Sequence, residues 1–214
     1  MKPFHLYLPG FLGSPDDWAP HASVSILDYS LDSFDAWSKD FYKQWSRYEV
    51  VDITGYSMGG RLALYLKQCF PNWIRHLCVI AADPGDIDDP ILRYQQDCQW
   101  AYRFETDSFG HVLSDWYDQP LFDSFKKSRH YSFYFLRRLK EDPIKWARAL
   151  RVLSVAKQPN LWPVCIEEPL VYVVGEKDKK YGDIASKIRL LNPQARVEIL
   201  PDIGHVAHLE RQQI

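Results

Sequence analysis

One serine stands between two glycines at a point where the sequence changes from a strand-like to a helix-like pattern. The stretch VVDITGYSMGGRLALYL runs from Val50 to Leu66 and contains Ser57 within Gly-Tyr-Ser-Met-Gly. Such a serine, at a tight turn from a strand into a helix, is typical of a nucleophile elbow. Its hydroxyl stands clear at the carboxyl edge of a sheet, beside a helix N-terminus that favours negative charge. We therefore predict that Ser57 carries chemistry rather than serving only as a turn residue.

A serine hydroxyl needs a base, and the base needs a carboxylate that orients it. In sheets of this type the order along the chain is serine, acid, histidine. Asp178 follows the apolar run PLVYVV, and His205 follows the run RVEIL. Each lies where a loop at the carboxyl edge of the sheet would begin. We predict that Ser57, Asp178 and His205 form a catalytic triad.

Other residues compete for the roles of base and acid. His208 lies three positions after His205, but it would already be inside the following helix. Asp83 follows the apolar run LCVIAA and is a rival acid. Glu176 and Asp202 are more simply explained as solvated loop charges.

A developing oxyanion is stabilised by backbone N–H groups rather than by particular side chains. One donor would be Met58, the residue after the serine, and another would come from the loop after the first strand. The segment LPGFLGS fits that loop, with Phe11 as the second donor.

Short apolar runs and helix-like runs alternate at both ends of the chain. The later apolar runs are nearly continuous, which is typical of parallel strands buried on both faces. The expected strands are Phe4–Leu8, Val24–Leu27, Val50–Thr54, Ile74–Ala81, Pro169–Val174 and Arg196–Leu200. The expected helices are Ser33–Trp45, Met58–Phe70 and about Ile184–Leu191. The fold class is therefore α/β, with a mostly parallel sheet flanked by helices.

The middle of the chain has a different pattern. Between about residues 86 and 162, aromatic and charged residues recur at helical spacing, and no convincing strand occurs. We predict that this segment is a helical cap inserted over the sheet. Residues 1–85 and 163–214 would then form the core.

Composition and charge exclude several classes of function. The chain has 214 residues, 26 Lys and Arg against 28 Asp and Glu, and a net charge of −2. Without a basic stripe, nucleic acid is not its main partner, whereas a small acidic substrate needs only a few local cations. No apolar run reaches membrane-spanning length, so we expect no membrane insertion.

The cysteines and other possible metal ligands show no spacing that indicates a site. The four cysteines lack a CxxC pattern, and no Cys, His and Asp cluster has metal-ligand spacing. We expect reduced thiols, a cytoplasmic protein without a metal or another cofactor, and a monomer or small homo-oligomer.

In combination, these motifs resemble the α/β-hydrolase superfamily. A closer resemblance lies in ordered blocks from Pro9 to Glu210: GYSMGGRLAL, QWAYRF, DWYDQPLF, SVAKQPNLWP, VYVVGEKDKKY and GHVAHLE. They are similar to the 2-succinyl-6-hydroxy-2,4-cyclohexadiene-1-carboxylate synthase family of menaquinone biosynthesis. The resemblance implies an α/β-hydrolase fold with an inserted helical cap, and a lyase that eliminates pyruvate by using a hydrolase-type triad.

The resemblance also implies roles for individual residues. Ser57, Asp178 and His205 match the triad, and Phe11 and Met58 match the oxyanion-hole positions. The implied substrate-binding residues are Tyr56, Arg61, Arg93, Trp116, Tyr117 and Arg138. The position of Arg138 comes from counting back across a segment where the family's sequence differs, so Arg137 stays open as the alternative.

The chemistry of the implied substrate agrees with these arginines, because it carries three carboxylates and the guanidinium fork suits a carboxylate. Arg61, one turn after the serine, is not explained by simple ester hydrolysis.

Two alternative functions stay open. The first is an esterase or thioesterase that forms an acyl-enzyme on Ser57. An apolar cap that suits an acyl chain would favour this alternative. The second is a non-enzymatic relative that binds a ligand or partner, and an intact triad argues against it.

Overall fold

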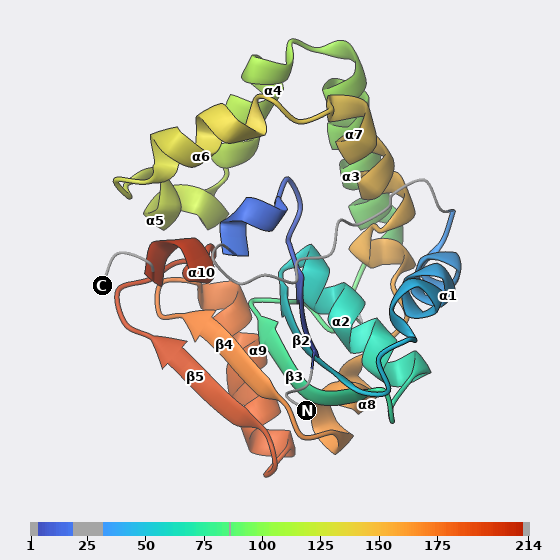
Figure 1. The fold of residues 1–214 in the computed structure, drawn as a ribbon. Helices are drawn as coiled ribbons and strands as arrows, with labels where there is room; N and C mark the ends of the chain where they lie inside the picture. The colour runs from blue at the N-terminus through green and yellow to red at the C-terminus, as the bar shows by residue number, and fades with distance from the viewer. Residues whose placement is uncertain (1–3, 19–31, 86, 212–214) are drawn as a thin grey trace.

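The computed structural model describes residues 4–18, 32–85 and 87–211. Within them, five strands form one parallel sheet in the spatial order β1-β2-β3-β4-β5 (Figure 1). The strands are β1 (Phe4–Leu8), β2 (Val51–Tyr56), β3 (Ile74–Ile80), β4 (Val171–Gly175) and β5 (Arg196–Leu200). The expected α/β fold with a parallel sheet is confirmed. The strand expected at Val24–Leu27 lies outside the described residues.

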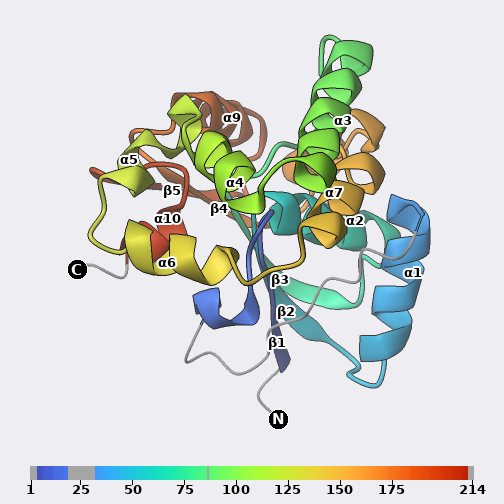
Figure 2. The same cartoon turned by 90° about the horizontal axis from the view of Figure 1, so that it is seen from above.

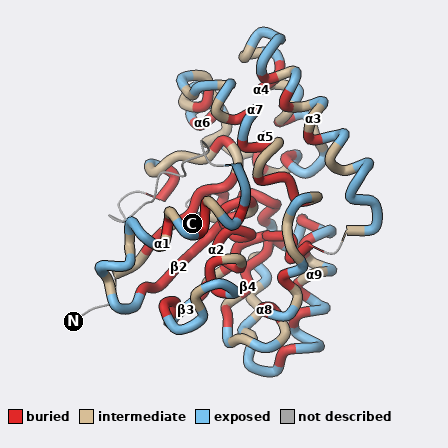
Figure 3. The backbone as a smooth tube through the Cα atoms, turned by 90° about the vertical axis from the view of Figure 1, so that its right-hand side faces the viewer, coloured by how far each residue is buried: buried red, intermediate tan, exposed pale blue. Residues whose placement is uncertain are grey.

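Four helices cover one face of the sheet. Helix α2 (Met58–Cys69) packs on β1, β2 and β3, and α9 (Lys179–Leu191) packs on β4 and β5. Helix α1 (Phe34–Trp45) packs against α2, and α8 (Trp162–Glu167) contacts both α2 and α9. Figure 3 shows buried residues concentrated along β2 and α2. Packed strands and helices can position side chains at the sheet edge accurately.

Local sequence explains where α1 and α9 begin. Ser33 caps α1 by accepting a hydrogen bond from the Ala36 N–H at 3.1 Å. Helix α9 begins five positions earlier than the expected Ile184. Its buried residues, Tyr181, Ala185 and Ile188, do have helical spacing, but two lysines and a glycine obscure the pattern at its start.

Between β3 and β4, all the regular elements of the described residues are helical. They include α3 (Pro90–Thr106), α4 (Phe109–Tyr117), α5 (Asp123–Lys126), α6 (Tyr131–Arg138) and α7 (Pro143–Val152), which we call the cap helices. Proline in the first turn and an aspartate cap begin both α3 and α7, and these two helices pack along each other. Figures 1 and 2 show the cap helices standing over one end of the sheet.

The described residues include no membrane-spanning helix, no group of metal-ligating side chains and no disulfide bond. None of their helices has the length and apolar character needed to cross a membrane. They contain no group of three or more His, Cys, Asp or Glu side chains arranged to hold a metal ion. Cys69, Cys78, Cys98 and Cys165 form no disulfide bond in this structure.

Candidate active site

The turn between β2 and α2 is tight because two glycines allow it. A Cβ atom on Gly55 would lie 2.4 Å from the carbonyl oxygen of Gly59, and one on Gly59 would lie 2.1 Å from that of Leu8. Between them, Ser57 has φ 49° and ψ −113°, a conformation that residues with a side chain rarely adopt. Its N–H donates to the Ile80 carbonyl at 2.8 Å, which fixes the strained turn against β3. This is the local geometry of a nucleophile elbow.

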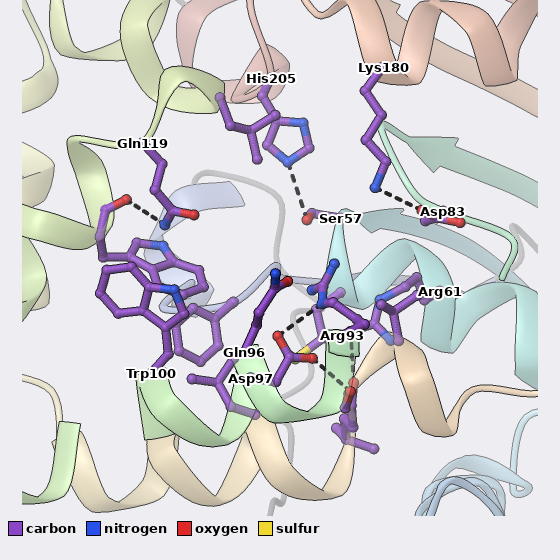
Figure 4. A pocket seen from close by; sticks show the side chains of 18 of the residues that line it. Ser57, Arg61, Asp83, Arg93, Gln96, Asp97, Trp100, Gln119, Lys180 and His205 are labelled. Carbon is purple, nitrogen blue, oxygen red and sulfur yellow. Dashed lines mark hydrogen bonds and ion pairs between the residues drawn. The ribbon is translucent and has the colours of Figure 1, made fainter. Parts of the chain in front are cut away.

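His205 lies between Ser57 and Asp178. Its Nε2 atom is 3.3 Å from Ser57 Oγ, and its Nδ1 atom is 2.6 Å from Asp178 Oδ2 (Figure 4 shows the Ser57 contact). The imidazole and the carboxylate are both buried. With Nδ1–H donated to Asp178, Nε2 is left to accept a proton from the serine hydroxyl.

Two glycines let the loops after β4 and β5 meet. A Cβ atom on Gly175 would lie 2.2 Å from the carbonyl oxygen of Gly204. The Lys177 N–H donates to the Ile203 carbonyl at 2.9 Å, and the Gly204 N–H donates to the buried Glu210 carboxylate at 3.0 Å. These contacts bring the acid and the histidine of the predicted triad together.

The rival base, His208, has other surroundings. The His208 ring stacks on Trp18, with 4.6 Å between centroids, and lies 4.3 Å from the Tyr56 ring. Burial, and then the positive charge of Arg138, lower the pKa of His208 to about 3, so this imidazole is neutral near pH 7.

Tyr56 also lies beside His205, at 5.4 Å between ring centroids, and burial raises the pKa of the Tyr56 hydroxyl well above the usual value.

The predicted oxyanion-hole residues both line the pocket at Ser57. Met58 is the first residue of α2, so its N–H has no acceptor within the helix. Phe11 lies in the loop after β1, where Leu12 has a φ of 61° and the Gly13 N–H donates to the Gly10 carbonyl at 2.9 Å. That the two N–H groups act together stays a prediction.

The pocket in front of the serine has a volume of about 240 Å³, and we call it the Ser57 pocket. One wall is aromatic, from Phe11, Trp100, Trp116 and Phe122. The other is charged, from Arg61, Asp83, Arg93, Asp97 and Lys180. Figure 4 shows Trp100 and Gln119 on one side of Ser57, and Arg61, Asp83 and Lys180 on the other. An apolar ring with acidic substituents fits such a divided pocket.

Arg61 is a buried cation on the charged wall of this pocket. Its two terminal nitrogens donate to Gln158 Oε1 at 2.9 Å and to the Leu153 carbonyl at 2.8 Å, and both acceptors are neutral. No carboxylate within the described residues forms an ion pair with it. Burial, and then the charge of Arg93, lower its pKa to about 10, so it remains positive near neutral pH. A buried charge without an ionic partner is unfavourable, and a bound anion would relieve that cost.

Arg93 lies on the inner face of α3. Its Nε donates to Asp97 Oδ1 at 3.0 Å, one helical turn further on. Asp97 is buried and also accepts a hydrogen bond from Ser154 Oγ at 2.6 Å. Asp97 therefore holds Arg93 at the pocket from one side, and 39% of the Arg93 side chain stays exposed.

The remaining predicted residues lie at two adjoining cavities. Trp116 lines the Ser57 pocket and also a smaller cavity of about 20 Å³ beside it, and Tyr117 and Arg138 line only the smaller one. Arg138 lies 2.5 Å from Asp17 Oδ2, and both side chains are buried. Tyr56 borders both cavities. The structure therefore brings Arg61 and Arg93 to the serine and places Arg138 one layer behind.

The alternative residue, Arg137, also lies away from the Ser57 pocket. It bonds to Asp16 and, at 3.2 Å, to Ser14 Oγ. Neighbouring arginines thus tie α6 to the segment after β1.

Sequence reasoning did not select three of the polar residues that surround the pocket: Asp97, Gln158 and Lys180. Two signals were present. Asp97 lies four residues after Arg93 on a predicted helical stretch, and Lys180 lies two residues after Asp178. Gln158 contacts Arg61 across 97 positions, and no local pattern indicates such a contact.

Comparison with known proteins agrees with this fold. The family model described as alpha/beta hydrolase family matches residues 6–214. The chain therefore belongs to the alpha/beta hydrolase family.

More specific relatives are also found. The 2-succinyl-6-hydroxy-2,4-cyclohexadiene-1-carboxylate synthase of Photorhabdus laumondii is 30% identical over 97% of this chain and 80% of its own length. The enzyme of that name from Enterobacter sp. (strain 638) is 29% identical over 97% of this chain and 86% of its own. Within the alpha/beta hydrolases, the chain belongs to this synthase family.

Solved structures show the same relationship. The structure of MenH from S. aureus has a TM-score of 0.90 and 26% identity, and the match covers 99% of this chain and 89% of that one. A thermophilic esterase from Thermogutta terrifontis has a TM-score of 0.78 at 16% identity, which shows the shared fold alone.

Proposed function

We propose that this protein is a carbon–oxygen lyase of menaquinone biosynthesis. It would eliminate pyruvate from 2-succinyl-5-enolpyruvyl-6-hydroxy-3-cyclohexene-1-carboxylate and form 2-succinyl-6-hydroxy-2,4-cyclohexadiene-1-carboxylate, the compound named in its relatives. The observation that carries the proposal is one pocket that holds both the Ser57–His205 pair and the buried Arg61, whose bonds are to neutral acceptors. It would work in the cytoplasm without a metal or another cofactor, as a monomer or small homo-oligomer.

The geometry supports a mechanism that begins with proton removal. His205, oriented by Asp178, takes the hydroxyl proton of Ser57, and the serine oxygen removes a ring proton alpha to the succinyl ketone. The electron pair of that C–H bond moves through the ring as a new double bond forms. The carbon–oxygen bond to the enolpyruvyl group breaks, and that group leaves and gains a proton as pyruvate. No covalent acyl-enzyme is required.

The negative charge of the intermediate develops on the succinyl carbonyl oxygen. In the proposal, the N–H groups of Phe11 and Met58 stabilise that oxygen, as an oxyanion hole stabilises a tetrahedral intermediate. The N-terminus of α2 favours the same charge. This is how a hydrolase-type site would support an elimination.

The two walls of the pocket would orient the substrate. Arg61 and Arg93 would bind carboxylates of the substrate, and the aromatic wall that includes Trp116 would contact its ring. Tyr56 would support the His205 ring. Tyr117 and Arg138 would contribute indirectly, from the smaller cavity beside the Ser57 pocket. A simple esterase would not require a buried cation four residues after its nucleophile.

The test is pyruvate release from the enolpyruvyl precursor, followed with lactate dehydrogenase and NADH. The proposal predicts one pyruvate per molecule of diene formed, and at least a 1000-fold loss of rate in Ser57→Ala. A purified, folded wild-type chain that releases no pyruvate but cleaves p-nitrophenyl acetate would support the esterase alternative instead.

A further inference from the structure

Lys180 is a third cation on the charged wall of the Ser57 pocket. It lies in the first turn of α9, two residues after Asp178. Its Nζ atom is 2.9 Å from Asp83 Oδ2, and 53% of its side chain is exposed. Figure 4 shows this pair on the same side of Ser57 as Arg61. The lysine therefore faces the space that a ligand would fill.

Asp83 has a hydrogen bond that does not depend on Lys180. Its Oδ1 atom accepts from the Gly85 N–H at 3.0 Å, and its backbone carbonyl accepts from Gln158 Nε2 at 2.9 Å. Gln158 in turn contacts Arg61. The carboxylate is thus fixed in the loop after β3, whereas the lysine side chain is flexible and half exposed. If the pair separates, Lys180 is the partner that can move.

The charges of the wall show which ligand would separate the pair. Asp97 balances Arg93, and Asp83 balances Lys180, while Arg61 has only neutral acceptors. A ligand with one carboxylate can be bound by Arg61 alone. A ligand with a second carboxylate near the pocket opening can compete with Asp83 for the ammonium group.

We propose that Lys180 is a specificity-determining residue that binds a second carboxylate of the substrate, and that Asp83 holds the lysine at the pocket until the substrate displaces it. The proposal rests on the proposed function for the identity of that substrate. It makes the pocket selective for polycarboxylates, because a monocarboxylate leaves the Lys180–Asp83 pair intact. Lys180 then contributes equally to the ground state and the transition state, so its loss should appear in KM rather than kcat.

The experiment is a double-mutant cycle on the pyruvate-release assay with Lys180→Met, Asp83→Asn and the double variant. The proposal predicts that Lys180→Met raises KM about 10-fold with kcat nearly unchanged, since a hydrogen bond to a charged group is lost. Lys180→Arg should keep most of the affinity. Asp83→Asn can still accept the Gly85 bond, and it should lower KM about threefold by releasing the lysine.

The double variant separates ligand binding from a purely structural role. If Lys180 only neutralises buried Asp83, removing both charges should restore the wild-type KM, and that result would overturn the proposal. If Lys180 binds substrate, the double variant should keep the raised KM of Lys180→Met, and the gain from Asp83→Asn should disappear.

A second measurement keeps the test independent of the reaction. Tricarballylate, a flexible tricarboxylate, is titrated into Ser57→Ala with and without Lys180→Met, and acetate serves as the monocarboxylate control. About 10-fold weaker tricarballylate binding, with acetate binding unchanged, supports the site. Equal tricarballylate binding by the two proteins contradicts it. Absent pyruvate release from the wild type would refute the proposed function without deciding this point.

Discussion

The guanidinium of Arg138 and the carboxylate of Asp17 lie 2.5 Å apart, and both are buried. One residue ends the cap helix α6, and the other lies in the 3-10 turn Pro15–Trp18, shortly after the Phe11 loop. This pair therefore connects the cap to the segment that would supply one oxyanion donor. Next to it, Arg137 makes a similar connection to Asp16 at the surface.

The two neighbouring arginines provide a matched test of this connection. Removing one partner of a buried ion pair leaves a buried charge, so Arg138→Met should lower the free energy of unfolding by about 3 kcal/mol. Arg137→Met should lower it by less than about 1 kcal/mol, because a partly exposed pair is worth little. Urea denaturation measures both, and equal losses would contradict the conclusion that the buried Arg138–Asp17 pair stabilises the fold more than the exposed Arg137–Asp16 pair.

Arg61 should determine affinity for the acidic substrate. Arg61→Met removes a buried cation that would contact a carboxylate, so KM for the enolpyruvyl precursor should rise about 100-fold. Arg61→Lys keeps the charge but loses the fork, so its KM should lie between those of Arg61→Met and the wild type. Steady-state kinetics checks this, with p-nitrophenyl acetate as a neutral substrate. A parallel loss of both activities would indicate a damaged site rather than a lost carboxylate contact.

Asp178 should act through the orientation and charge of His205. Asp178→Asn should reduce kcat for pyruvate release by about 10,000-fold, because the neutral amide no longer holds the productive tautomer or stabilises the imidazolium. The control is Glu176→Gln, a loop carboxylate that accepts a hydrogen bond from the Asp202 N–H at 3.0 Å. That control should keep the wild-type kcat. Similar losses in the two variants would refute the assignment of the acid.

His208 should make the fold sensitive to acid. Its pKa is about 3 in the folded chain, below the value of about 6.5 expected when unfolded. As the pH falls, the unfolded state takes up the proton first, so stability is complete above pH 6.5 and is lost as the pH falls toward 3. Between pH 7 and pH 5, protonation of this one group in the unfolded state should lower the free energy of unfolding by about 2 kcal/mol.

His208→Phe keeps a ring between Trp18 and Tyr56 but cannot titrate. Urea denaturation gives the free energy of unfolding at pH 7 and at pH 5. The decrease between the two pH values should be about 2 kcal/mol smaller for the variant than for the wild type. An unchanged difference would mean that other groups cause the acid sensitivity.

The arrangement of Ser57, His205 and Asp178 could be predicted from the sequence because each of the three follows a strand. The carboxyl ends of parallel strands meet at one edge, so the strand order and the loop positions already bring Ser57, Asp178 and His205 together. The glycine pattern around the serine is also visible in the sequence, and its cause is close packing, since a side chain at Gly59 would collide with the backbone of β1. The fold class followed from apolar runs in the same way.

The cap could not be predicted at the same level. Whether Arg138 faces a ligand or a carboxylate depends on how α6 is rotated and on Asp17, which lies 121 positions earlier. The role of Lys180 depends in the same way on Asp83, in the loop after β3. Such contacts arise from tertiary packing between charged residues, and neither periodicity nor spacing contains them.

The most direct test of the central claim compares two activities on one purified sample. Pyruvate release from the enolpyruvyl precursor and hydrolysis of p-nitrophenyl acetate are measured for the wild type, Ser57→Ala and Arg93→Ala. We expect fast pyruvate release that is lost in Ser57→Ala and strongly reduced in Arg93→Ala, with only weak ester cleavage by the wild type. Ester cleavage that requires Ser57 but not Arg93, with no pyruvate release, would contradict the account and identify an ordinary hydrolase.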